Sequence, residues 1–127
     1  VMSVHFDWPL IGAQAMQIDR FARFADDFRP AHGVHAALVG DFNAAAWSRA
    51  VARAGAVAGA AAVSGFNGTW RGAAPGAMPS GVSALPFGAP LDHILLSPGA
   101  RLRAIDTVPI AGSDHLALRA TLFIPAP

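Results

Sequence analysis

Four short polar clusters adjoin apolar runs, and their residue types are those that bind metal ions or transfer protons. They are His5-Phe6-Asp7, Asp41-Phe42-Asn43, Asp92-His93 and Ser113-Asp114-His115. Aspartate, asparagine and histidine without cysteine suit a hard cation such as Mg²⁺ or Mn²⁺, which prefers oxygen ligands. The rival is a zinc site built from the histidines of three clusters (His5, His93 and His115), but no HExxH-like spacing supports zinc.

The stretch "HAALVGDFNAAAW", residues 35–47, carries the sharpest of these signals. An ionised carboxylate at the end of a buried strand is costly unless it is paired or bound to a metal. On an extended chain Asp41 and Asn43 face one side, and Phe42 faces the core on the other. The simpler alternative is a turn, which Gly, Asp and Asn all favour, and each of the other clusters also has such a structural alternative.

The elements that must position these clusters are indicated by apolar periodicity. Phe21, Phe24 and Phe28 recur at helical spacing, which predicts a helix over 14–28 with Gln14 and Asp19 on its solvated face. A second helix is expected over 45–54, with Gly55 as its stop. Strands are expected at 1–5, 34–39, 94–97, 102–108 and 116–124. Strands mixed with helices indicate an α/β or α+β layered fold.

Composition limits the possible functions. The 127 residues are 54% hydrophobic and 13% charged, which indicates one globular domain. Cysteine, lysine and glutamate are absent, so this chain holds no disulfide, no Schiff-base lysine and no catalytic glutamate. A net charge of +1 gives no strong electrostatic case for nucleic-acid binding. The most apolar run, 54–63, is shorter than the ~20 residues of a membrane span. Since the sequence opens abruptly at Val1 in a strand-like run without a visible signal peptide, we expect a piece of a longer protein.

Five stretches occur in an order that is typical of a known family: "VHFDWP", "GDFNAAAWS", "TW", "PLDHILLSPG" and "GSDHLAL". From about Ser3 to Ile124 the chain resembles the C-terminal half of the endonuclease/exonuclease/phosphatase superfamily domain. The resemblance implies the second half of a four-layer αββα sandwich with mixed, largely antiparallel sheets. Residues 1–127 would then form half of one domain, and the N-terminal half would be missing from this chain. The closest likeness is to bacterial members, which implies a cytoplasmic protein or one tethered to a membrane through an upstream region.

The resemblance also implies roles for the residues of the metal and phosphate site. Asp41 would orient or deprotonate the attacking water and help bind Mg²⁺ or Mn²⁺. Asp114 would bind the metal, and Asn43 would hydrogen-bond a phosphate oxygen.

Four further positions acquire roles from the same resemblance. His115 would meet the phosphate, either as a charged donor or as the group that transfers the proton, and Asp92 would hold its ring. His5 would donate to a non-bridging phosphate oxygen, and Trp70 would pack near the site.

The function implied is a metal-dependent phosphoesterase acting on nucleic acid, a phospholipid headgroup or a sugar phosphate. The long Gly/Pro/Ser-rich stretch 64–90 would border the substrate groove. The first half of the family's domain supplies an asparagine and a metal-binding glutamate, and neither motif occurs in this chain. The alternative is therefore a non-catalytic binding or structural module of the same family, and a third is an unrelated metal-binding α/β protein. By itself the chain is expected to be weakly active or inactive and to self-associate through exposed apolar surface.

Overall fold

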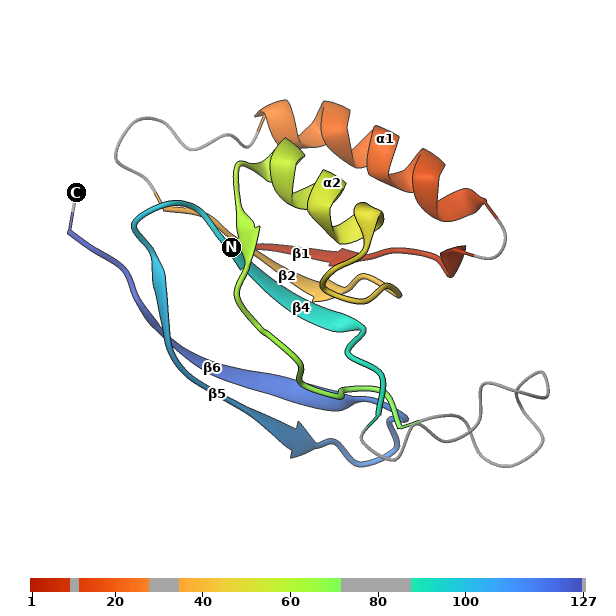
Figure 1. Ribbon diagram of the computed structural model, residues 1–127, viewed down its shortest axis with the longest axis vertical. Coiled ribbons are helices and arrows are strands. Elements are labelled where there is room, and N and C mark those ends of the chain that lie inside the picture. Colours follow the sequence, from red (N-terminus) through yellow and green to blue (C-terminus); the bar gives the residue numbers. More distant parts are fainter. Residues whose placement is uncertain (10–11, 28–34, 72–87, 127) are drawn as a thin grey trace.

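The computed structural model describes residues 1–9, 12–27, 35–71 and 88–126. In this part of the chain, two helices lie on one side of a four-stranded sheet and a two-stranded sheet lies on the other (Figure 1). The predicted mixed α/β class is confirmed.

The four-stranded sheet has the order β1-β2-β4-β3. β1 (Met2–His5) runs parallel to β2 (Ala37–Asp41), while β4 (Asp92–Leu96) runs antiparallel to both β2 and the short β3 (Ala61–Ala62). The register places His5 beside Asp41 and Asp41 beside Asp92. The sheet is therefore mixed but largely antiparallel, as expected, and three polar residues meet at one of its edges.

Helix α1 (Ala13–Asp27) packs against the sheet through a stripe that differs from the predicted one. The buried residues are Ile18, Phe21 and Ala25, whereas Phe24 is 53% exposed. Phe28, the last member of the predicted stripe, lies outside the described residues. The helical period was right, but the buried face is centred on a different row of residues. Ile18 and Ala25, at i−3 and i+4 from Phe21, share the buried face with it, whereas Phe24 does not.

Helix α2 (Arg49–Ala58) begins and ends later than predicted. Ser48 is its N-cap and accepts a hydrogen bond from the Val51 amide, and Gly59 ends it in the left-handed conformation. Gly55 does not stop the helix but lies inside it, where a Cβ would come within 2.6 Å of the Ala60 carbonyl oxygen. This glycine therefore allows the chain after the helix to approach α2 closely.

The hairpin of β5 (Arg101–Pro109) and β6 (Leu116–Phe123) covers the other face of the main sheet. Alternate β6 residues Leu118, Ala120 and Leu122 pack with Ile94 and Leu96 of β4. The opposite residue of β4, Leu95, packs with the helices instead. The alternation of side chains along β6 thus turns its apolar residues toward the face that joins the two sheets.

The Gly/Pro/Ser-rich stretch 64–90 is only partly described, because residues 72–87 lie outside the described ranges. Its described ends are ordered by contacts with the sheet: Ser64, Thr69 and Trp70 are buried, and Trp70 forms isolated bridges with Ala89 and His115. Among the described residues, no helix is both long and apolar enough to cross a bilayer.

Candidate active site

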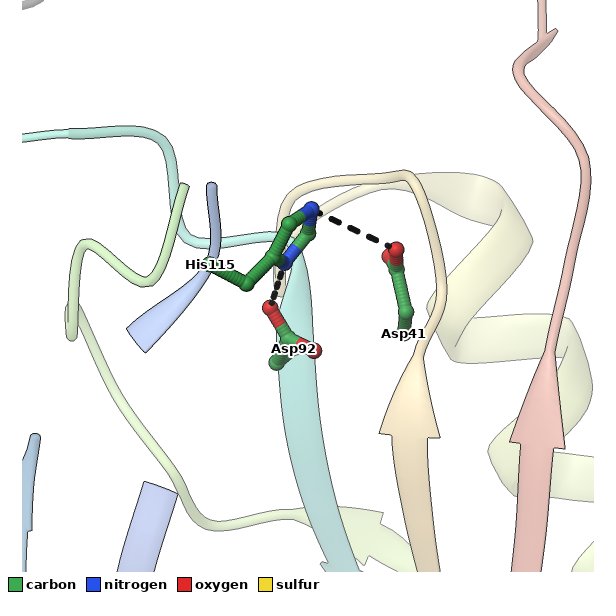
Figure 2. Close-up of side chains that lie close together, drawn as sticks. All are labelled: Asp41, Asp92 and His115. Atoms are coloured by element: carbon green, nitrogen blue, oxygen red, sulfur yellow. Dashed lines mark hydrogen bonds and ion pairs between the residues drawn. The ribbon is translucent and has the colours of Figure 1, made fainter. Parts of the chain in front are cut away.

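The polar clusters converge because of strand direction. Asp41 ends β2 and His5 ends the parallel β1, so both lie at the same edge of the sheet. Asp92 begins the antiparallel β4, which brings the amino end of that strand to the same edge. His115 directly precedes β6 and reaches this edge from the second sheet, so that its ring lies between the two aspartates (Figure 2).

The His115 ring is held from one side and faces a second carboxylate on the other. Its Nδ1 lies 2.7 Å from Asp92 Oδ2, and its Nε2 lies 3.7 Å from Asp41 Oδ2 (Figure 2). An ionised carboxylate can only accept, so the Nδ1–H group donates a hydrogen bond to Asp92, and Nε2 is directed at Asp41. This is the arrangement by which a carboxylate fixes the tautomer and orientation of an imidazole.

The Asp41 carboxyl is surrounded by groups that shift its pKa in opposite directions. Burial raises its pKa above the usual value, and the nearby Asp92 carboxylate raises it further. The Asn43 backbone N–H, which donates to Asp41 Oδ1 at 2.7 Å, lowers the same pKa, as do His115 and His5. The net direction is upward, so the site favours a bound proton or a neighbouring positive charge at Asp41.

The turn after Asp41 combines both expectations for this stretch. Phe42 is 1% exposed and packs edge-on against Phe6, so the aromatic side chain faces the core as predicted. Asn43 adopts a positive φ of 46°, a turn conformation that asparagine tolerates, and its Nδ2 donates to the Phe6 carbonyl at 2.7 Å. Asn43 thereby ties the end of β2 to the end of β1.

Gln14 was expected on the solvated face of the first helix, and this prediction is wrong. Its side chain is buried, and its Nε2 lies 2.9 Å from the Phe42 carbonyl oxygen and 3.0 Å from that of Asp7. It also lies 3.5 Å from the Asn43 carbonyl oxygen. The signal was in the sequence, because Gln14 precedes Ile18 by four residues and so shares the buried face.

His5 and Asp114 lie at the margins of this arrangement. The His5 side chain is 76% exposed, and its Nε2 lies 3.7 Å from Asp41 Oδ2. Asp114 Oδ2 accepts a hydrogen bond of 3.1 Å from the Trp70 indole. Trp70 is itself buried and packs edge-on against Trp8, as its expected packing role requires.

His93 points away from the site, since it alternates with Asp92 along β4. Its Nε2 lies 2.7 Å from the Ala44 carbonyl oxygen, which can only accept, so Nε2 donates and Nδ1 accepts from the Ser64 hydroxyl at 3.2 Å. Burial lowers the pKa of His93, in agreement with this neutral form. Because both ring nitrogens are engaged in the core, His93 does not complete a zinc site with His5 and His115.

The sequence model of the endonuclease/exonuclease/phosphatase family matches residues 2–115. The chain belongs to this family. A search of curated proteins found no sequence match.

Solved structures of the same family have a similar fold. A mannosyl-6-phosphatase of Bacteroides thetaiotaomicron superposes with a TM-score of 0.62 over 96% of this chain, at 16% identity. An endonuclease/exonuclease/phosphatase family protein of the same organism gives a TM-score of 0.62 over 97% of the chain, at 17% identity. The chain spans 50% and 49% of these two structures. At such identities the likeness shows the fold alone.

The donor set at the sheet edge is compatible with a divalent cation. Ligand atoms of Asp41, Asp92 and His115 all lie within 4.8 Å of one another. Burial and the neighbouring Asp92 carboxylate raise the pKa of Asp41, and a bound cation would offset this cost of ionising Asp41. Asp114 is not a member of this group, and its Oδ2 accepts the hydrogen bond from the Trp70 indole.

Proposed function

We propose that this chain contributes the proton-transfer half of a phosphoesterase site, which hydrolyses a phosphodiester or phosphomonoester by attack of water. The observation that carries the proposal is the Asp92–His115 pair, 2.7 Å apart, with the free edge of the imidazole facing Asp41. The family membership supports a hydrolase of this superfamily. Phosphoryl transfer requires positioning and neutralisation of charge, and the donors at this sheet edge suit both requirements.

In the proposed reaction, Asp41 orients or deprotonates the attacking water. Its raised pKa brings the carboxylate closer to the proton affinity that a base needs near neutral pH. His115 meets the phosphate through Nε2, while Asp92 holds the ring through Nδ1. His5 is exposed enough to reach a non-bridging phosphate oxygen. Asn43 would donate to another through the second N–H of its Nδ2, because the first N–H is bonded to the Phe6 carbonyl.

The residues present fit a metal ion of the Mg²⁺ or Mn²⁺ type. Asp41 is the proposed ligand at the sheet edge, where ligand atoms of Asp92 and His115 lie within 4.8 Å of its own. Asp114, the second ligand that the resemblance implies, lies outside this group, and its Oδ2 accepts a hydrogen bond from the Trp70 indole. A bound cation would supply charge neutralisation at the phosphate and lower the pKa of water.

We further propose that the complete site needs a second half-domain. The chain spans about half of the two matched structures, and its sequence holds no glutamate to serve as a metal ligand. The same observations favour the second candidate function, a non-catalytic module of the family that binds a phosphoester without hydrolysing it. The two candidates differ in turnover but share the binding residues.

The test measures hydrolysis of p-nitrophenyl phosphate and bis(p-nitrophenyl) phosphate with Mg²⁺ or Mn²⁺ by a protein that contains both this chain and the proposed second half-domain. We expect activity that EDTA abolishes and that added Mn²⁺ restores, and that Asp92→Asn lowers. The matched control is Asp106→Asn, which removes an exposed carboxylate paired with Arg119 on the other sheet. Activity that persists in excess EDTA would refute the metal dependence. Binding of Mn²⁺ and phosphate without turnover would favour the non-catalytic candidate.

A further inference from the structure

Asp92 and His115 belong to different sheets, so their pairing needs a connection other than the pairing of strands. Asp92 begins β4 of the four-stranded sheet, and His115 directly precedes β6 of the two-stranded sheet. Among the described residues, no strand of one sheet pairs with a strand of the other. Apolar packing between the sheets is not directional, whereas the 2.7 Å hydrogen bond between His115 Nδ1 and Asp92 Oδ2 requires a defined geometry.

The segment 69–71 supplies this connection. It follows β3 and lies beside the start of β6 (Figure 1). Trp70 forms isolated bridges with Ala89, three residues before Asp92, and with His115. Trp70 and Ala89 also exchange two backbone hydrogen bonds, of 2.7 and 3.0 Å. The segment therefore joins the chain that leads into β4 to the chain that leads into β6.

Thr69 is bonded at both members of the Asp92–His115 pair, through two different groups. Its hydroxyl accepts a hydrogen bond of 3.1 Å from the Asp92 amide. Its carbonyl oxygen accepts a hydrogen bond of 2.6 Å from the amide of Leu116, the residue after His115. Because one residue makes both bonds, it sets the backbone of Asp92 relative to the backbone of His115.

The Thr69 side chain is fully buried, at 0% exposure, and its hydroxyl is fully used. Besides the Asp92 amide, the hydroxyl accepts from the Leu91 amide at 3.3 Å, and it donates to the Ala89 carbonyl at 3.4 Å. Water cannot readily take the place of a hydroxyl in such a position, so its removal leaves backbone amides at the start of β4 without this acceptor. The start of β4 is then free to shift.

We propose that Thr69 is a positioning residue of the phosphoesterase site, which acts through the Asp92–His115 pair and does not touch the substrate. The inference rests on the proposed function for the role of the pair in turnover. Without the Thr69 hydroxyl, the Asp92 carboxylate no longer holds the His115 ring in one orientation. Serine retains this hydroxyl, whereas valine has the shape of threonine but lacks it.

The first experiment observes the pair directly, in the chain described above and without substrate or metal. In ¹H NMR spectra of the ¹⁵N-histidine-labelled chain, the proton on His115 Nδ1 should give a separate low-field resonance, assigned by its loss in His115→Ala. Thr69→Val should shift this resonance upfield or broaden it by exchange with water, and Thr69→Ser should retain it.

Ser64→Ala is the matched control for a general loss of stability. Ser64 is a second buried residue whose hydroxyl accepts from a β4 amide, in this case that of Ile94. The control should lower the melting temperature as Thr69→Val does, but it should leave the His115 resonance in place.

The second experiment measures kcat and KM with bis(p-nitrophenyl) phosphate, in a protein that contains both this chain and the proposed second half-domain. Thr69→Val should lower kcat about 10- to 100-fold and change KM by less than about threefold, and Thr69→Ser should restore most of the rate. In an Asp92→Asn background, Thr69→Val should lower kcat by a further factor of about two or less, because its effect passes through the pair.

Four results would each overturn the positioning role. They are an unchanged His115 resonance in Thr69→Val, an equal change in Ser64→Ala, no such resonance in the unsubstituted chain, and an undiminished effect of Thr69→Val in the Asp92→Asn background. If Thr69→Val alters the resonance but the unsubstituted protein has no turnover, the result supports the positioning role and refutes the proposed hydrolysis.

Discussion

Gln14→Leu should destabilise the protein through the turn that carries Asp41 and Asn43. Leucine is a helix former of similar size to glutamine, but it lacks the amide of this buried side chain. That amide donates to the Phe42 carbonyl at 2.9 Å and lies 3.5 Å from the Asn43 carbonyl oxygen, and both contacts are buried. Its third partner, the Asp7 carbonyl, belongs to an exposed residue that water can reach.

The magnitude follows from the carbonyls that lose their donor. A buried polar group left without a partner costs about 1–3 kcal/mol, and one or two such carbonyls result here. After a partial gain from the buried leucine, we expect about 2–4 kcal/mol, which is a large part of a typical domain's stability. For a chain of this size the melting temperature should fall by about 10 °C.

Gln17→Leu is the matched control, one turn further along the same helix. Gln17 also contacts Asp7, accepting from its amide at 2.6 Å and donating to its carboxylate at 2.9 Å, but these contacts are exposed. Water replaces them, so we expect a loss of about 1 kcal/mol or less. Urea denaturation and thermal melting of both variants provide the comparison. If Gln14→Leu costs no more than Gln17→Leu, the buried amide does not hold the turn and our reasoning is wrong.

Three further predictions concern the strands. Asp92→Asn and His115→Ala should each lower kcat by about 10²–10⁴-fold, and the double variant little more, because paired groups act as a unit; losses that multiply in steady-state assays would contradict this. Burial lowers the pKa of His93, so the stability linked to its neutral form is present above about pH 6.5 and is lost as pH falls below that value. His93→Gln should therefore flatten the pH dependence of the urea unfolding midpoint between about pH 7.5 and 5. An unchanged slope of midpoint against pH would count against this prediction. Gly40→Ala should abolish the native fold, since Gly40 has a φ of 139° and an added Cβ would lie 1.9 Å from the Val4 carbonyl oxygen; a melting temperature close to that of the unsubstituted chain would show that β1 can shift.

The strands and the family were predictable because their signals are local. Short apolar runs bounded by Gly, Pro and Asp indicated β1, β2, β4, β5 and β6 to within a few residues, whereas the two-residue β3 was not expected. The limits of α2 were not predictable in the same way, because alanines fill both the turn before the helix and the helix itself. The cap at Ser48 and the left-handed Gly59 decide the limits, whereas Gly55 looks like a stop and is instead a packing contact.

The site was only partly predictable, because its support is tertiary. The sequence and the resemblance indicated Asp41, Asp92 and His115, which the structure brings together. Gln14 was missed because a glutamine on a helix is usually solvated, although its spacing from Ile18 places it on the buried face, where the turn opposite it accepts its hydrogen bonds. His93 was grouped with the polar cluster of Asp92, although adjacent residues of a strand face opposite sides.

The adjacent residues Asp92 and His93 explain how β4 is kept in the register that places Asp92 in the site. A slip of β4 by one residue would turn Asp92 toward the helices and His93 toward His115, which would place a carboxylate in the core. His93 opposes such a slip, because its hydrogen bonds to Ala44 and Ser64 exist only in the observed register. The Leu91 and Asp92 amides, which both donate to the Thr69 hydroxyl, fix the start of the strand in the same way. The buried histidine and threonine therefore hold the carboxylate that in turn holds the His115 ring, and the geometry of the proposed site depends on residues that never meet the substrate.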